Sequence, residues 1–185
     1  MIELRRPNLK DKELFFEWRN DPNIYSWCRQ FLPLSKDEHE KYWYEQEYDK
    51  TSEMFAIYKH SDTPRIVDSD FSEGSVCIGC CGLTSIDYVN SRAEFSLYIG
   101  SECQGYGFGK QALYELFMVG FDKLGLNRIW GETFNNNPAI HVFESLGMEL
   151  EGIRKQFYFR DGEFINAFLY SINKRMLLNA KMLGK

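Results

Sequence analysis

The chain lacks the features that mark membrane and exported proteins. Its 185 residues contain no apolar run of about 18 residues, the length that predicts a membrane-spanning helix. The first residues, Met1 to Pro7, include no apolar segment of the kind found in signal peptides. These absences predict a cytoplasmic protein with no membrane partner.

Cysteine and histidine are too few and too scattered to predict a metal site. There are five cysteines and three histidines, and only Cys77, Cys80 and Cys81 lie close together. These three fall in a strand-like stretch, with no second cysteine or histidine pair at ligand spacing. We therefore expect free, buried thiols in a reducing compartment and no metal cofactor.

Positive charge is also scarce. The net charge is −5, and the lysines and arginines form no basic stripe, so nucleic acid is not an expected partner. A negative balance mildly favours a cationic acceptor such as an amine, although ordinary solubility explains it equally well. The composition, 44% hydrophobic and 26% charged, is typical of a globular domain.

Periodicity and capping residues predict an α/β domain with a mixed sheet. Asn8 and Ser35 are expected N-caps, and Ser35 forms a capping box with Glu38. Helices are expected at 8–20, 36–48, 108–124, 137–147 and the C-terminus, with a helical turn at 23–28. Strands are expected at 2–6, 53–59, 75–86, 92–99, 128–134, 148–159 and 163–172, and the last two are expected to form a hairpin across Arg160-Asp161-Gly162. A loop is expected at 60–74, and the glycines at 79 and 82 suggest a bulge.

The most informative segment lies between an expected strand and the clearest helix. Three glycines alternate in it, at Gly105, Gly107 and Gly109. Glycine permits a positive φ and a close approach of the backbone to a ligand, and a helix start offers free N–H groups with partial positive charge. Such a segment predicts a phosphate or pyrophosphate site.

Three other interpretations of these glycines compete with this one. A simple tight turn needs no ligand. A Rossmann site requires G-x-G-x-x-G in a βαβ unit, whereas this spacing is G-x-G-x-G and lies past the middle of the chain. A Walker A loop requires one more residue between its outer glycines and a Ser or Thr where Gln111 stands.

The segment resembles the Q/R-x-x-G-x-G/A signature of the GNAT acetyltransferases, and three further motifs follow the same family in the same order. They are Ala93-Glu94 on the expected strand 92–99, Asn136-Asn137-Pro138-Ala139 with Phe143 and Gly147-Met148, and the ends of the chain at 17–22 and 152–171. The two ends resemble the branch that holds ribosomal-protein alanine acetyltransferases and amino-sugar acetyltransferases. The resemblance implies one GNAT domain over residues 1–185, with a mixed, mostly antiparallel sheet of about six or seven strands flanked by helices.

The resemblance also implies acetyl-CoA as cosubstrate and a set of residues that contact it. The pyrophosphate would lie on the loop, and strand N–H groups at 97–99 would face the thioester oxygen. The implied cofactor-binding residues are Leu97, Tyr98, Ile99, Gln104, Gly105, Tyr106, Gly107, Phe108, Gly109, Lys110, Asn136, Asn137 and Phe143.

Two family positions depart from the pattern. Met148 stands where the motif ends on an aromatic residue, which is the milder change within an apolar site. The tyrosine that usually protonates the departing thiolate is Phe143 here, and phenylalanine has no proton to give. Tyr158 and Tyr170 are alternative donors, although packing within the sheet also explains both. Glu94 and Glu132 are the two candidates for the general base that deprotonates the amine, and an exposed or ion-paired strand residue is the competing interpretation of Glu94.

The acceptor remains open in the sequence. Trp18, Arg19 and Asn20 are candidates for its pocket, although Trp18 shares a helix face with Leu14 and also fits a core position. The branch favours a protein N-terminus or an amino sugar, while polyamines and aminoglycosides also fit. A different acyl donor, or a non-catalytic acyl-CoA-binding module, is the alternative function. A monomer or a homodimer is expected.

Overall fold

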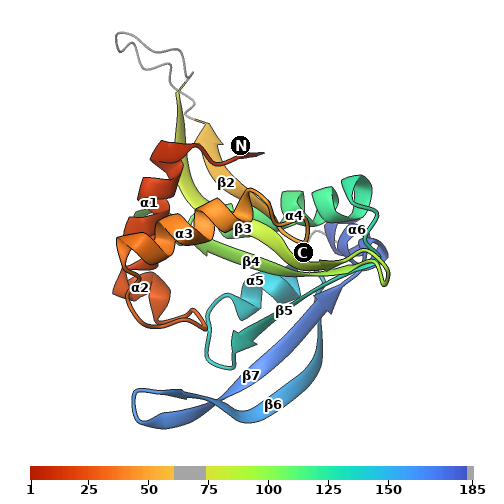
Figure 1. Cartoon of the computed structure of the whole chain (residues 1–185). Helices are drawn as coiled ribbons and strands as arrows, with labels where there is room; N and C mark the ends of the chain where they lie inside the picture. The colour runs from red at the N-terminus through yellow and green to blue at the C-terminus, as the bar shows by residue number, and fades with distance from the viewer. Residues whose placement is uncertain (61–73, 183–185) are drawn as a thin grey trace.

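The computed structural model describes residues 1–60 and 74–182. Most of the loop expected at 60–74 lies outside the described residues. Seven strands form one mixed sheet in the order β1-β2-β3-β4-β5-β7-β6 (Figure 1). They are β1 (Ile2–Arg5), β2 (Glu53–His60), β3 (Ser75–Asp87), β4 (Arg92–Ile99), β5 (Arg128–Phe134), β6 (Glu149–Arg160) and β7 (Glu163–Ile172). Every adjacent pair is antiparallel except β4 and β5, which confirms the expected fold class.

The helices cover both faces of this sheet. One face carries α1 (Leu9–Arg19), α2 (Pro22–Tyr25) and α3 (Lys36–Gln46), and the other carries α4 (Phe108–Met118), α5 (Ile140–Ser145) and α6 (Lys174–Met182) (Figure 1). Neighbouring strand residues point to opposite faces, so Cys80 packs among the first three helices while Cys81 packs beneath α4. Both thiols are fully buried and free, as predicted.

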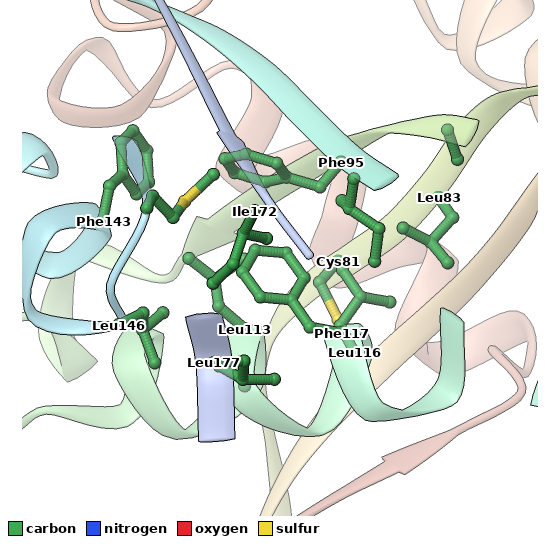
Figure 2. Close-up of a cluster of buried hydrophobic side chains, with 14 of the residues drawn as sticks. Cys81, Leu83, Phe95, Leu113, Leu116, Phe117, Phe143, Leu146, Ile172 and Leu177 are labelled. Carbon is green, nitrogen blue, oxygen red and sulfur yellow. The ribbon is translucent and has the colours of Figure 1, made fainter. Parts of the chain in front are cut away.

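The larger core lies between the sheet and α4 to α6. Figure 2 shows Leu113, Leu116 and Phe117 of α4 packed against strand residues that include Cys81 and Phe95. Leu113, Leu116 and Phe117 are completely buried, and their spacing follows the apolar stripe visible in the sequence. This core fixes the start of α4 against the middle of the sheet.

Local capping signals are confirmed by hydrogen bonds. Ser35 Oγ accepts from Glu38 N at 3.3 Å, and the Glu38 carboxylate accepts from Ser35 N at 2.8 Å. Asn8 forms an equivalent box with Asp11.

The β6–β7 turn is Asp161-Gly162, with φ of 49° and 87°, which suits a two-residue hairpin.

Two expected helix boundaries are wrong. The helix expected at 108–124 is an α-helix only to Met118 and continues as the π-helical segment Val119–Lys123. In that segment Gly120 lies so close to β5 that a Cβ would stand 2.7 Å from Ile129 Cδ1. The helix expected from Asn137 begins at Ile140, because Asn137 caps a preceding turn by accepting from Ala139 N at 2.9 Å.

The expected strand bulge is confirmed at one glycine only. The β2–β3 register shifts where Ile57 pairs with Gly79 and Tyr58 pairs with Cys77. Gly82 keeps regular pairing and serves close packing instead, since a Cβ there would lie 2.2 Å from Met54 Sδ.

Candidate active site

Strands β4 and β5 pair briefly and then separate. Their parallel pairing joins Arg92, Ala93 and Glu94 to residues 128–130, after which each strand continues alone on this side. The strand expected at 92–99 is confirmed, and beyond Glu94 it separates from β5. The separation leaves the backbone of β4 beyond Glu94 without a strand partner on the β5 side.

Two of the three expected amides face this gap. Gly100 N donates to Ile78 O of β3 at 2.9 Å. Because N–H groups alternate along a strand, the N–H of Tyr98 also points to β3, whereas those of Leu97 and Ile99 point into the gap. Leu97 and Ile99 thus offer donors to a ligand, and the N–H of Tyr98 does not.

The glycine loop leads from the end of β4 into α4. Gly105 and Gly107 have φ of 81° and 78°, and a Cβ on either would meet no atom within 4 Å. The left-handed backbone explains why glycine stands at both positions, and the open space around them leaves room for a ligand. Gly109 is different, because its Cβ position lies 3.6 Å from Leu97 Cδ2, in ordinary contact with β4.

The start of α4 leaves N–H groups free beside this loop. Gly107 is the N-cap and has no side chain to bond them, and the first bond onto the cap is Gln111 N to Gly107 O at 3.3 Å. The N–H groups of Phe108, Gly109 and Lys110 precede that bond and remain available. Free donors at a helix start suit a pyrophosphate, as the sequence predicts.

The expected cofactor-binding side chains differ in what they contact. Gln104 Nε2 donates to Ile99 O at 2.9 Å, so this side chain holds the loop against β4. Tyr106 is 72% exposed and lies beside the Phe108 ring, with centroids 6.0 Å apart. Asn137 lines the cavity described next, whereas Asn136 is exposed and does not line it.

A cavity of about 590 Å³ occupies the gap between the strands and extends under the first helices. Its lining combines charged and aromatic side chains from α1, α3, β4, β5, β6 and the segment between α2 and α3. The charged members are Arg19, Arg29, Glu38, Glu94 and Glu132. Among the described residues, no group of three or more His, Cys, Asp or Glu side chains is arranged to hold a metal ion.

Glu94 is a buried carboxylate with one oxygen engaged. It is 7% exposed, and its Oε1 lies 2.7 Å from Arg29 Nη2. Burial raises the pKa of Glu94 above its ordinary value, and the Arg29 guanidinium offsets part of that rise. Its Oε2 has no hydrogen-bond partner among residues 1–60 and 74–182. An accessible, more basic carboxylate at a cavity suits a general base.

Glu132 is less available than Glu94. Its side chain is 2% exposed, Oε2 lies 2.7 Å from Arg154 Nη1, and Oε1 accepts from the Tyr158 hydroxyl. Burial and this carboxylate raise the pKa of Tyr158 to about 12. Because both oxygens of Glu132 are engaged, Glu94 is the better candidate for the base.

Phe143 lies where the cavity meets the larger core. Its ring packs edge-on against Phe95, with centroids 5.3 Å apart, and lies 5.8 Å from the Tyr170 ring. Tyr170 donates to Glu144 at 3.2 Å and is outside the cavity lining, so it is poorly placed to replace the missing acid. Tyr158 reaches the cavity but is engaged with Glu132.

Two of the three expected acceptor residues have structural roles. Trp18 is buried in the core beneath α1, as its helix face suggested. Asn20 closes the segment that follows α2, accepting from Leu34 N at 2.7 Å and donating to Phe16 O at 3.1 Å. Arg19 alone lines the cavity, where it donates to Gln30 at 3.2 Å.

The sequence gives little signal for Arg29, Tyr42 and Tyr158 as neighbours in one cavity. Arg29 follows a four-residue helix, and Tyr42 lies on α3 among polar residues. They meet Glu94 only because β4 and β5 separate beneath them. The isolated Arg29, within the segment that Asn20 anchors, was the only hint of this arrangement in the sequence.

Comparison with known proteins decides the family. Residues 2–149 match the family model described as an acetyltransferase (GNAT) domain. The chain belongs to the GNAT family of acetyltransferases. No helix among the described residues meets the length and apolarity needed to cross a membrane.

Relatives of this GNAT chain include enzymes that act on a polyamine. It is 30% identical over 144 residues to spermidine N(1)-acetyltransferase of Escherichia coli K12, covering 75% of each chain. It is 35% identical over 99 residues to the uncharacterized N-acetyltransferase p20 of Bacillus licheniformis, covering 53% of this chain and 56% of p20.

A solved structure extends the likeness to the whole fold. The spermidine N-acetyltransferase of Vibrio cholerae, solved in complex with CoA and spermine, superposes with a TM-score of 0.81 at 25% identity. The superposition covers 96% of this chain and 98% of that one. Acetyl-CoA is therefore the cosubstrate of this GNAT domain, and its reaction is N-acetyl transfer.

Phe143→Tyr is expected to change kcat by less than about threefold. A free alkyl thiol has a pKa of about 8.5, so a departing thiolate needs little help from an acid near neutral pH. The added hydroxyl would lie at the cavity edge beside Phe95 and Tyr170. Steady-state kinetics at saturating acceptor would measure the effect, and a tenfold rise in kcat would mean that thiolate protonation limits the wild-type enzyme.

Proposed function

We propose that this enzyme acetylates a primary amino group of a polyamine by direct attack on acetyl-CoA. The observation that carries the proposal is the buried Glu94 carboxylate, which lines the cavity where β4 and β5 separate. The sequence relatives named for spermidine, and the solved relative holding CoA and spermine, support the choice of acceptor. The acceptor expected from the chain ends, a protein N-terminus or an amino sugar, has weaker support.

The proposed reaction assigns each part of the site one task. The free N–H groups of Gly105 to Lys110 bind the pyrophosphate, and the N–H groups of Leu97 and Ile99 donate to the thioester carbonyl oxygen as it gains charge. Glu94 takes one proton from the ammonium, directly or through water. The neutral nitrogen then forms its bond to the acetyl carbon, the carbon–sulfur bond breaks, and CoA leaves as a thiolate. The second proton of the nitrogen is released to water or to that thiolate, which gives the neutral amide and free CoA.

Deprotonation of the amine is the harder of the two proton transfers. An alkyl ammonium with a pKa near ~10 is almost entirely charged at neutral pH, and a charged nitrogen has no lone pair for attack. The raised pKa of Glu94 makes it a stronger base than an exposed carboxylate while leaving it negative enough to attract a cation. A polyamine supplies further ammonium groups, for which Glu38 of α3 is the exposed carboxylate of the cavity.

An acceptor panel tests this proposal. We expect spermidine or spermine to give a kcat/KM at least roughly tenfold above that of an N-terminal alanine peptide or glucosamine, because a desolvated carboxylate discriminates between acceptors by their charge. The measurement is release of CoA thiol, with mass spectrometry of the acetylated product. Equal or better turnover of the peptide or the sugar would contradict the proposed acceptor while leaving N-acetyl transfer intact.

A further inference from the structure

Arg160, at the end of β6, connects the C-terminal hairpin to the segment that follows α2. Its Nη2 donates to Arg29 O at 2.7 Å, across 131 residues of sequence, and its Nη1 donates to Phe159 O at 2.7 Å. Hydrogen bonds from a charged guanidinium are stronger than those between neutral groups. The backbone of Arg29 is therefore tied to the hairpin.

The Arg160 guanidinium is also enclosed by aromatic rings. It lies 4.0 Å from the centroid of Phe31, 5.2 Å from Phe134 and 5.3 Å from Tyr158. Its Nε is buried and has no hydrogen-bond partner among the described residues. Planar stacking of this kind is available to arginine and not to lysine, so both the orientation and the identity of this side chain matter.

Arg29 extends from that anchored backbone toward the proposed base. Its Nη2 reaches Glu94 Oε1 at 2.7 Å, although the Arg29 side chain is 52% exposed while that of Glu94 is only 9% exposed. A half-exposed arginine on an unrestrained loop would pair weakly, because ordering a long side chain costs entropy. Anchoring of the backbone by Arg160 removes part of that cost.

We propose that Arg160 is a positioning residue, which holds Arg29 against Glu94 and so keeps the base ionised when the amine arrives. This inference rests on the proposed function, because it takes Glu94 as the base. Arg160 has no task in the acetyl transfer steps themselves. Its effect passes through the Arg29 backbone and the Arg29–Glu94 ion pair.

Among the charged groups around Glu94, Arg29 is the cation best placed to favour the ionised form of Glu94. Arg154 of β6 is already paired with Glu132 of β5, and Glu132 itself opposes ionisation of Glu94. Thr84 of β3 donates only to the Glu94 backbone carbonyl, at 3.4 Å. The remaining titratable groups that line the cavity are Arg19, Cys28, Glu38, His39, Tyr42, Tyr98 and Tyr158.

The pH dependence of kcat/KM tests the inference. Glu94 must be deprotonated to act, so activity falls on the acid side as it gains a proton. Removing a cation within ~4 Å raises a carboxyl pKa by roughly one unit or more. We therefore expect Arg29→Met and Arg160→Ala each to move the acid-side fall to higher pH, by roughly one unit for Arg29→Met and by less for Arg160→Ala.

Three comparisons separate positioning from a merely structural role. Arg29→Lys should restore most of the wild-type profile, because it keeps the charge. Arg160→Ala should add no further shift in an Arg29→Met background, since both act on one ion pair. Arg92→Met is the matched control. Arg92 is an exposed arginine of β4, the strand that carries Glu94, and it pairs with Asp87 outside the cavity. This variant should leave the profile unchanged.

A measurement that does not depend on turnover is also needed, because a variant could lose activity simply by unfolding. Carbon-13 NMR of the side-chain carboxyls, recorded over a pH series, would give the midpoint pH of the Glu94 titration directly. The Glu94 signal would be assigned by its loss in Glu94→Gln. Arg160→Lys, which keeps the charge and loses the planar stacking, should raise that midpoint in a folded protein. An unchanged midpoint in both Arg160 variants would overturn the inference, whereas full activity of Glu94→Gln would instead overturn the proposed base.

Discussion

Glu94→Gln is expected to lower kcat roughly 10²-fold while acetyl-CoA binds as in the wild type. The substitution keeps the shape of a side chain that is only 9% exposed and removes its ability to accept a proton. The loss should be largest near neutral pH and should shrink at high pH, where more of the amine is already neutral. Stopped-time assays of CoA thiol from pH 6 to 9, with calorimetry for acetyl-CoA, would measure both parts.

A matched control for that result is Glu151→Gln. Glu151 is also a sheet carboxylate, bonded to Arg128 and Ser171, but it lies outside the cavity. Its replacement should leave kcat within about twofold, as for a surface change with no catalytic role. Should Glu94→Gln keep full kcat across the pH range, Glu132 or a chain of water molecules becomes the better candidate for the base.

Gly107→Glu is expected to abolish detectable acetyl-CoA binding. The new side chain adds a negative charge at the N-cap of α4, where the free N–H groups would otherwise meet a pyrophosphate. It also forces a non-glycine residue into left-handed backbone, at a cost of about 1–2 kcal/mol. Calorimetry would measure the affinity, and circular dichroism would establish that the protein remains folded.

Gly125→Glu separates the charge from the backbone strain. Gly125 also has a positive φ, 66°, and no atom within 4 Å of its Cβ position, but it lies after the π-helical segment, away from the loop. Both variants carry the same added charge and similar strain. Loss of binding in both variants would mean that strain or instability is responsible, and normal binding by Gly107→Glu would place acetyl-CoA elsewhere.

Features encoded by neighbouring residues were predictable from the sequence. The capping box of Ser35 and Glu38, the hairpin turn at Asp161-Gly162 and the stripe on α4 depend on contacts within a few residues, and each is confirmed. The π-helical extension after Met118 was missed, because it reflects the approach of Gly120 to Ile129 on a strand that follows it.

The site was predictable in proportion to how local its parts are. The glycine loop and the Glu94 strand carry family motifs, so the sequence placed them together. Arg29 belongs to no motif and meets Arg160 across 131 residues, a separation at which no periodic pattern in the sequence connects them. Trp18 and Asn20 were expected in the acceptor pocket because the segment 17–22 resembles the family and is polar and aromatic, but a helix end turns successive side chains in different directions.

The most direct test of the account is a crystal structure of the protein with CoA and a polyamine. The account predicts the pyrophosphate on the N–H groups of Gly105 to Lys110 and a primary amine within hydrogen-bond reach of Glu94, between β4 and β5. A polyamine whose amines all lie away from that gap, with Glu94 still paired only to Arg29, would contradict it.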